Sequence, residues 1–157
     1  MNHVATKIRF LEGVKIELTF IDGKIIQFDM STLFDKYPQF KKLKEDRKLF
    51  ESGELWFWGE VIYWNEDIDY DSEAVYQDGI QVGFIEPSLN QKIAMVILEG
   101  REKDNITQTE LSKLSKINQG DISRIETGQG NPTLKKIQKI LDALGKTMVI
   151  TLKDKKE

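Results

Sequence analysis

One 22-residue segment constrains this chain most, from Thr107 to Gly128, with the sequence TQTELSKLSKINQGDISRIETG. Thr107 is followed three residues later by Glu110, the pattern of a capping box, in which two side chains satisfy free backbone N–H groups at a helix start. Asn118 is a good cap for a second helix, and Asp121 falls in the first turn, where the helix dipole favours an anion. The segment therefore predicts two short helices joined by a tight turn.

The outward face of the second predicted helix is polar. Ile122 and Ile125 lie on its buried side, and Gly128 is placed to end it in a left-handed conformation. The residues left to face outward are Gln119, Gly120, Asp121, Ser123 and Arg124. A short helix that displays hydrogen-bonding groups after a tight turn is the arrangement with which small proteins read the major groove of DNA.

These residues resemble the Cro-type (XRE-like) phage-repressor helix-turn-helix family, whose pattern of Thr-Gln, a leucine three residues on and then Ile-Ser-Arg-Ile-Glu-x-Gly is nearly complete here. The likeness covers roughly residues 88–145 and includes one helix before the segment and one after it. The apolar stripes expected for the flanking and first helices are Ile93, Val96, Ile97 and Gly100, then Leu111 and Leu114, then Leu134, Ile137, Ile140, Leu141 and Leu144.

The chain departs from the family at two positions. The family usually has glycine in the turn, where this chain has Lys116, and a left-handed lysine there costs about 1 kcal/mol. Gly120 stands where related repressors often place a longer base-reading side chain.

The resemblance implies contacts with double-stranded DNA. Gln108 contacts a phosphate and braces Gln119, which reads a base, and Arg124 reads a second base; a solvated surface arginine is the alternative. The backbone near Gly130 and Asn131 contacts another phosphate. The expected DNA-binding set is Thr107, Gln108, Asn118, Gln119, Gly120, Asp121, Ser123, Arg124, Gly130 and Asn131. The resemblance also implies a buried structural salt bridge between Arg101 and Glu126, the reading we prefer for that pair.

Charge and aromatic content divide the chain into two domains. Residues 1–88 hold 10 basic and 17 acidic residues, net −7, whereas residues 89–157 hold 13 and 9, net +4. All 15 aromatic residues lie at or before Phe84. We expect an α+β domain over 1–80, a linker over 81–88, an all-α lambda-repressor-like helix-turn-helix domain with a C-terminal strand over 89–153, and a disordered tail over 154–157.

The first domain reads as an antiparallel sheet with one or two helices. Asp22-Gly23 predicts a type I′ hairpin turn between strands at residues 15–21 and 24–29. A helix is expected over residues 39–50, a strand or hairpin over 55–64, and one helical turn over 72–76. This half resembles a small bacterial domain of unknown function that occurs ahead of Cro-type modules, through Phe20 to Gly23, Asp29-Met30, Phe40 to Leu43 and Trp64. That resemblance implies a fold and no activity.

No residue set in the first domain supports catalysis, so we expect no enzyme and no cofactor. His3 is the lone histidine, and Ser/His/Asp, Cys/His, phosphate-loop and HExxH patterns are absent. The run Asp67, Asp69, Asp71 and Asp78 is better explained as a solvated acidic strand and turn than as a calcium loop, so no metal is expected. The basic cluster at residues 41–48 is interrupted by Glu45 and Asp46, which favours a solvated face over a second nucleic-acid patch.

The remaining features concern location and assembly. The chain has no cysteine, no apolar run long enough to span a bilayer and no signal-peptide pattern, so we expect a cytoplasmic protein without membrane contact. The strand expected over residues 146–153 pairs either with its twofold mate or with the first domain, and we favour the homodimer.

The predicted function is a sequence-specific DNA-binding regulator, a repressor or antitoxin-like autoregulator that binds a palindromic operator as a dimer. The first domain would bind a partner protein or small ligand. The alternative is an interaction protein whose helix-turn-helix is a docking surface without DNA binding.

Overall fold

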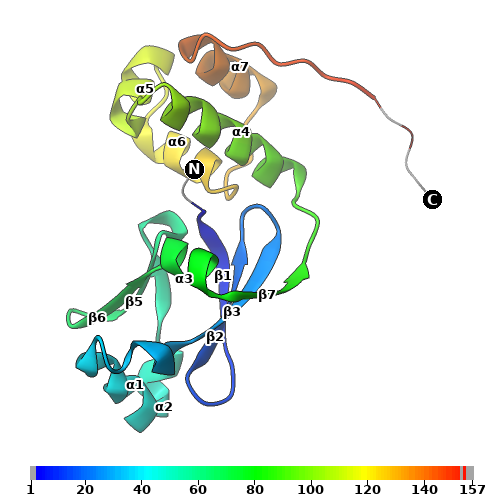
Figure 1. The fold of residues 1–157 in the computed structure, drawn as a ribbon. Coiled ribbons are helices and arrows are strands. Elements are labelled where there is room, and N and C mark those ends of the chain that lie inside the picture. Colours follow the sequence, from blue (N-terminus) through cyan, green and yellow to red (C-terminus); the bar gives the residue numbers. More distant parts are fainter. Residues whose placement is uncertain (1–2, 153, 155–157) are drawn as a thin grey trace.

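The computed structural model describes residues 3–152 and 154 and shows two lobes stacked on each other (Figure 1). The first lobe, residues 3–84, combines antiparallel sheets with helices, and the second lobe, from residue 89 onward, is helical. The predicted succession of an α+β half and a helical half is therefore confirmed. Apart from Asp154, the tail predicted over residues 154–157 lies outside the described residues.

The larger sheet of the first lobe has four strands, which are β1 (Ala5–Phe10), β2 (Lys15–Phe20), β3 (Lys24–Asp29) and β7 (Ile80–Phe84). They lie in the order β1-β2-β3-β7, and every neighbouring pair is antiparallel. Alternation along β2 buries Ile16, Leu18 and Phe20 on one face, because successive side chains of a strand point to opposite sides.

The hairpin between β2 and β3 is closed by a turn that differs from the expected type I′. The loop has three residues, Ile21 to Gly23, and only Gly23 has a positive φ, of 90°. Its N–H donates to the Phe20 carbonyl at 2.9 Å, the pattern of a type I turn followed by a left-handed residue. The loop is one residue longer than a type I′ turn because it includes Ile21, whose side chain is fully buried against the second lobe.

Residues 81–84 lie in strand β7 and not in the expected linker. Ile25 pairs with Gly83 and Lys24 with Phe84, so this segment completes the sheet that the first hairpin begins. Only residues 85–88 connect the lobes. The glycines at 79 and 83 and Pro87 made the segment resemble a linker, because a strand partner so distant in sequence leaves no local signal.

The helix expected over residues 39–50 is divided. The chain forms η1 (Met30–Leu33), η2 (Pro38–Phe40), α1 (Lys41–Glu45) and α2 (Arg47–Glu51). Asp46 separates the last two with an extended backbone, φ −125° and ψ 100°, and its carboxylate accepts a hydrogen bond from the Leu49 N–H at 3.0 Å. The aspartate therefore caps a new helix where the apolar spacing alone predicts continuation.

A smaller sheet completes the first lobe, formed by β4 (Glu54–Trp56), β5 (Val61–Asn65) and β6 (Ile68–Asp71), with η3 (Phe57–Gly59) between β4 and β5. Helix α3 (Ser72–Asp78) follows and leads into β7. The core between the sheets is rich in aromatic residues; the buried Trp64 indole N–H donates to the Phe50 carbonyl at 2.8 Å. No group of three or more His, Cys, Asp or Glu residues in the described part of the chain could hold a metal ion.

The second lobe consists of α4 (Leu89–Lys103), α5 (Gln108–Ser115), α6 (Gln119–Glu126) and α7 (Leu134–Ala143). Its core is aliphatic and contains Ile97, Leu111, Ile117, Ile122, Ile125, Ile140 and Leu144. Three side chains expected in buried stripes, Val96, Leu114 and Leu134, are instead 58%, 59% and 64% exposed. In a lobe of four short helices each buried stripe is narrow, and these three side chains lie beyond its edge.

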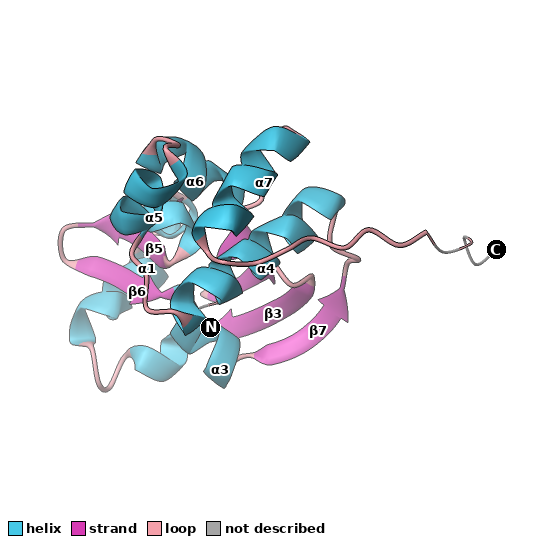
Figure 2. Cartoon of the chain, turned by 90° about the horizontal axis from the view of Figure 1, so that it is seen from above, coloured by secondary structure: helices cyan, strands magenta, loops and turns pink. Residues whose placement is uncertain are grey.

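The two lobes meet at a small apolar contact in which Val4 and Ile21 of the first lobe are buried with Ala94 of α4. The view from above shows the helices of the second lobe over the strands of the first (Figure 2). Gly23 lies so close to the connector that an added Cβ would be 2.1 Å from the Ile85 carbonyl oxygen. Glycine is therefore required at this junction.

The C-terminal segment differs from the expected strand. Among the described residues from 146 to 152 no strand is formed, and Val149, Ile150 and Leu152 are 81%, 69% and 96% exposed. Residue 153, the last of that expected strand, lies outside the described residues. The physical reason is that a strand needs a hydrogen-bonding partner, which this single chain does not supply. No helix in the described part of the chain is both long and apolar enough to cross a membrane.

Candidate nucleic-acid interface

Helix α5 begins at the predicted capping box. The Thr107 hydroxyl accepts a hydrogen bond from the Glu110 N–H at 3.2 Å, and the Glu110 carboxylate accepts one from the Thr107 N–H at 2.7 Å. The backbone N–H of Thr107 holds the pKa of Glu110 below its ordinary value. This reciprocal cap fixes the residue at which α5 begins.

The turn between α5 and α6 places Lys116 in the left-handed region, with φ 57° and ψ 33°. Two serine hydroxyls hold the chain on either side, since Ser112 donates to the Ile117 carbonyl at 2.6 Å and Ser115 to the Leu111 carbonyl at 2.7 Å. The conformation expected at the family's glycine position is therefore present with a lysine, and the surrounding hydrogen bonds compensate for its strain.

A buried ion pair joins three helices of the second lobe. Arg101 Nε lies 2.7 Å from Glu126 Oε1, and the side chains are only 14% and 3% exposed. Arg101 also donates to the Ile106 carbonyl at 2.9 Å, and Gln108 Nε2 donates to Glu126 Oε2 at 2.9 Å. Burial acts to lower the pKa of Arg101, but the hydrogen bond to Glu126 and its charge outweigh burial and keep it raised. The pair thus links the ends of α4 and α6 to the start of α5.

Helix α6 presents an exposed polar face at its leading end. Asn118 caps it by accepting a hydrogen bond from the Asp121 N–H at 2.7 Å. Gln119, Gly120 and Arg124 are all exposed. A Cβ added at Gly120 would meet only the Asn118 side chain, at 3.5 Å, so the backbone around Gly120 is open to close approach by a ligand. This face is available for the edge of a base pair.

Two expectations for this face differ from the structure. Ser123 is 2% exposed, so its hydroxyl is inside the lobe and cannot contact DNA; one step along the helix from Ile122, it faces inward. Gln108 is engaged by Glu126 and does not brace Gln119, whose side-chain oxygen instead accepts a hydrogen bond from the Thr109 hydroxyl at 3.3 Å. The sequence offered no signal for Thr109, because that contact depends on the helix crossing.

Asp121, expected on the outward face, is held by a lysine from another helix. Its carboxylate lies 2.7 Å from Lys136 Nζ of α7. The hydrogen bond from Lys136 lowers the pKa of Asp121, which is 29% exposed. The pair leaves the interface with one less free negative charge beside α6.

Three lysines of α7, which the sequence did not indicate as part of the interface, lie near the start of α6 together with Lys116. A hollow of about 350 Å³ is lined by Lys116, Ile117, Asn118, Asp121, Thr133, Lys135, Lys136 and Lys139. Four lysines around one depression provide the positive potential that a phosphate backbone requires. The Thr133 cap predicts where α7 begins along the chain, but only the packing of α7 against α6 brings its lysines to this hollow.

A second hollow, of about 260 Å³, lies at the other end of α6 and is lined in part by Arg124, Gly130 and Asn131. The Gly130 N–H donates to the Arg124 carbonyl at 2.9 Å, which fixes the loop against the helix. Helix α6 therefore has a depression near each of its ends, and the expected phosphate-contacting segment near Gly130 borders one of them.

Comparison with known proteins finds a matching family for each half of the chain. Residues 97–150 match the family described as Helix-turn-helix, and residues 5–81 match the family described as Protein of unknown function (DUF2442). An uncharacterized HTH-type transcriptional regulator of Haemophilus influenzae is 40% identical over 63 residues, which are 39% of this chain and 64% of that protein. The chain thus spans less than two thirds of its curated relative's length.

A crystal structure of a candidate DNA-binding protein from Nitrosomonas europaea aligns with 89% of this chain and 84% of its own, at 13% identity and a TM-score of 0.40. Both resemblances drawn from the sequence are confirmed by the two family matches. Along the chain, the match to the DUF2442 family over residues 5–81 is followed by the match to the Helix-turn-helix family over residues 97–150.

Proposed function

We propose that this chain is a sequence-specific DNA-binding transcriptional regulator, and that it acts as a dimeric repressor or antitoxin-like autoregulator at a palindromic operator. The helix-turn-helix match and the regulator relative support the DNA-binding class. The observation that carries the proposal is the exposed end of α6, with Gln119, Gly120 and Arg124 open beside a lysine-lined hollow.

Base recognition in this proposal falls to Gln119 and Arg124. An amide side chain pairs with adenine and a guanidinium with guanine, and each good bidentate pair discriminates by about 1 to 3 kcal/mol. Gly120 contributes no side chain, so it allows the α6 backbone to lie close to the groove. Because each α6 helix makes few base contacts, sequence specificity depends on two copies of the chain binding two correctly spaced half-sites.

The phosphate contacts fall to the two hollows that flank α6. Lys116, Lys135 and Lys139 approach one strand, and the loop at Gly130 and Asn131 approaches the other. Such contacts set register and supply most of the salt-dependent affinity. The net charge of +4 over residues 89–157 agrees with phosphate contacts made by the second lobe.

Dimerisation in this proposal uses the C-terminal segment. Thr147 to Leu152 alternates β-branched and apolar residues, and Val149, Ile150 and Leu152 are exposed. Pairing with the same segment of a second copy buries these side chains and satisfies the backbone. Two α6 helices about 34 Å apart then read two half-sites. The first lobe senses a partner protein or small ligand.

The test is binding of purified full-length protein to duplexes selected from random sequence, measured by fluorescence anisotropy across a range of salt concentrations. Affinity is expected to fall steeply as salt rises. Arg124→Ala should weaken the selected duplex roughly 5- to 100-fold and a scrambled duplex much less. Lys44→Ala, which removes an exposed positive charge from the first lobe, is the matched control and should change little.

Two results would count against the proposal. Failure to select or bind any duplex at low salt would favour the alternative, a helix-turn-helix that serves only as a docking surface. Equal loss of selected and scrambled binding in Arg124→Ala would remove its base-reading role. For the dimer, Ile150→Lys should shift the sedimentation profile to monomer, and an unchanged profile would contradict the assigned interface.

A further inference from the structure

A cavity of about 780 Å³ opens in the first lobe, within the size range of small-molecule sites. It is lined by Phe28, Thr32, Leu33, Lys36, Tyr37, Gln39, Phe40, Asp67, Asp69, Tyr70, Asp71, Ala74 and Asp78. These residues come from β3, η1, η2, β6, α3 and the turns beside them, so the cavity exists only in the folded lobe. Nothing in the helix-turn-helix domain contributes to it.

The floor of the cavity is a continuous group of aromatic rings. Tyr70 stacks on Phe28 with ring centroids 5.7 Å apart and meets the edge of Phe40 at 5.9 Å. Tyr37 extends the group, 6.0 Å from Phe40. Phe28 and Phe40 are buried, whereas Tyr37 and Tyr70 are partly open to the cavity. Ring faces of this kind attract cations and apolar chains.

The rim is strongly negative. Four of the lining residues are aspartates, and among the described residues that line the cavity Lys36 is the only cation. Asp71 caps α3 by accepting from the Glu73 N–H at 2.7 Å, and Asp67 lies 3.7 Å from Lys42 Nζ. Asp69 and Asp78 make no hydrogen bond or ion pair with any part of the chain that the structure describes. Neither carboxylate thus forms a direct ion pair within the described residues, although the charge of Asp78 acts on the nearby Lys36.

Lys36 shows what this surface attracts. Its ammonium nitrogen lies 5.0 Å from the centre of the Tyr37 ring, so the floor already holds one cation. Burial raises the pKa of the Tyr70 hydroxyl, and the nearby charge of Asp78 raises it further, as expected in a negative environment. The absence of a three-residue metal group in the described chain points away from an inorganic ion.

We propose that this cavity binds an organic amine with two or more ammonium groups, a linear polyamine, which pairs with Asp69 and Asp78 while its methylene chain lies on the rings of Tyr37 and Tyr70. The inference rests on the sensing role proposed for the first lobe and names its ligand class. Methylene segments match the aromatic floor, and separated charges match separated carboxylates.

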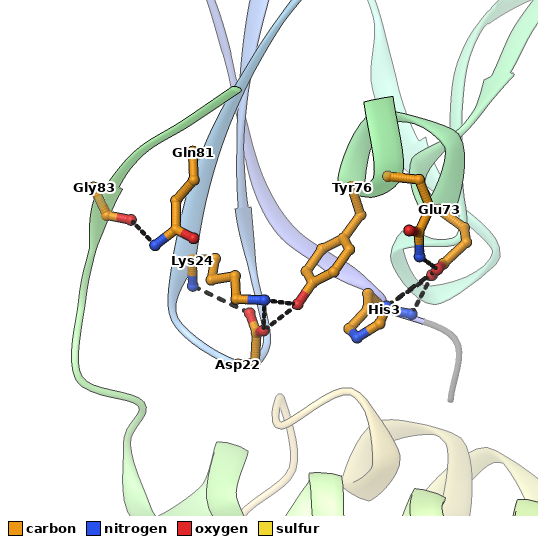
Figure 3. A network of polar contacts seen from close by, with 8 residues as sticks. His3, Asp22, Lys24, Glu73, Tyr76, Gln81 and Gly83 are labelled. Carbon is orange, nitrogen blue, oxygen red and sulfur yellow. Dashed lines mark hydrogen bonds and ion pairs between the residues drawn. The ribbon is translucent and has the colours of Figure 1, made fainter. Parts of the chain in front are cut away.

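Helix α3 connects the cavity to the junction between the lobes. Ala74 and Asp78 line the cavity, whereas Glu73 and Tyr76 of the same helix contact His3 and the β2–β3 hairpin (Figure 3). The Tyr76 hydroxyl donates to Asp22 at 2.7 Å, and the Tyr76 ring stacks on His3 at 3.6 Å. That hairpin carries Ile21, which is buried with Ala94 of α4. A ligand on Asp78 therefore contacts the helix whose Tyr76 binds the hairpin that packs against α4.

The test is isothermal titration of the full-length protein with spermidine at low salt, with triethylene glycol as an uncharged probe of similar length and Mg²⁺ as an inorganic cation. Saturable binding of spermidine is expected, with no heat from triethylene glycol and weaker competition from Mg²⁺. Asp69→Asn and Asp78→Asn should each weaken spermidine binding roughly 5- to 10-fold. Lys36→Gln removes the internal cation and should strengthen binding severalfold.

Glu12→Gln is the control, since it removes one negative charge from an exposed position of the first lobe outside the cavity. It should leave spermidine affinity within about twofold. Circular dichroism and tryptophan fluorescence establish that each variant is folded. Absence of saturable binding, equal weakening in Glu12→Gln, weakening in Lys36→Gln, or binding of an arginine-rich peptide but not spermidine would each overturn the proposal. The titration contains no DNA, so its outcome is independent of the Arg124→Ala test.

Discussion

The two lobes are stabilised in different ways. The first lobe joins segments far apart in sequence, as when β3 pairs with β7, and fills its core with aromatic rings such as Phe50 and Trp64. The second lobe is built from consecutive short helices around an aliphatic core. The first lobe has an open cavity between elements distant in sequence, whereas the second lobe displays the end of a helix.

This difference also makes the lobes separately observable. All three tryptophans, at positions 56, 58 and 64, lie in the first lobe, while α4 to α7 supply most of the helix. Tryptophan fluorescence therefore follows the first lobe and far-ultraviolet circular dichroism mainly the second. The predictions below use these two signals to separate the lobes or to show that they unfold as one unit.

The largest effect is expected from Glu126→Ala. It leaves Arg101 buried without its partner, which should lower the free energy of unfolding of the second lobe by about 3 to 5 kcal/mol. Urea denaturation should then show the dichroism transition at lower urea than the fluorescence transition. Glu99→Ala, at an exposed position of α4, is the control. If both signals moved together by the same amount, the lobes would form a single cooperative unit.

A smaller effect of opposite sign is expected from Lys116→Gly. Glycine adopts the left-handed conformation without the Cβ penalty, so the second lobe should gain about 1 kcal/mol. Lys113→Gly, within α5, should instead lose about 0.5 to 1 kcal/mol through helix propensity. The dichroism midpoint measures both changes. Similar losses in the two variants would show that the Lys116 side chain contributes more than its backbone strain costs.

The smallest effect is expected from the pH dependence of Asp121→Asn. Lys136 holds the pKa of Asp121 in the folded lobe below the ordinary 3.8, so its ionised form stabilises the lobe above that pH. This contribution should disappear as the pH falls through the lowered pKa. The difference in dichroism midpoint between wild type and variant should be present at pH 7 and should close as the pH is lowered below 3.8. A constant difference at all pH values would contradict the assigned ion pair.

The sequence predicted the second lobe well because its signals are local. The Thr107–Glu110 box, the Asn118 cap and the turn at Lys116 each depend on residues within a few positions of one another. Ser123 was misplaced because its neighbours come from the packing of α6 against the lobe, and the lysines of α7 were missed because only the helix crossing brings them to Asn118.

The first lobe was predicted less completely for the complementary reason. Its hairpin has a local turn signal, but the pairing of β7 with β3 and the cavity beneath α3 depend on residues distant in the chain. Asp46 shows a local limit too, since apolar spacing predicts one helix where a capping carboxylate starts another. The C-terminal segment differs because none of the described strands pairs with it, and a strand does not form without a partner.

The four-residue connector between β7 and α4 has a consequence for how the lobes stay together. A tether this short holds its two ends at an effective concentration in the millimolar range, so docking is nearly free of the entropy of bringing separate molecules together. The few side chains around Ile21 and Ala94 can therefore keep the lobes in contact although they would not unite two free proteins. The relative position of the lobes therefore depends in large part on the few side chains of this patch.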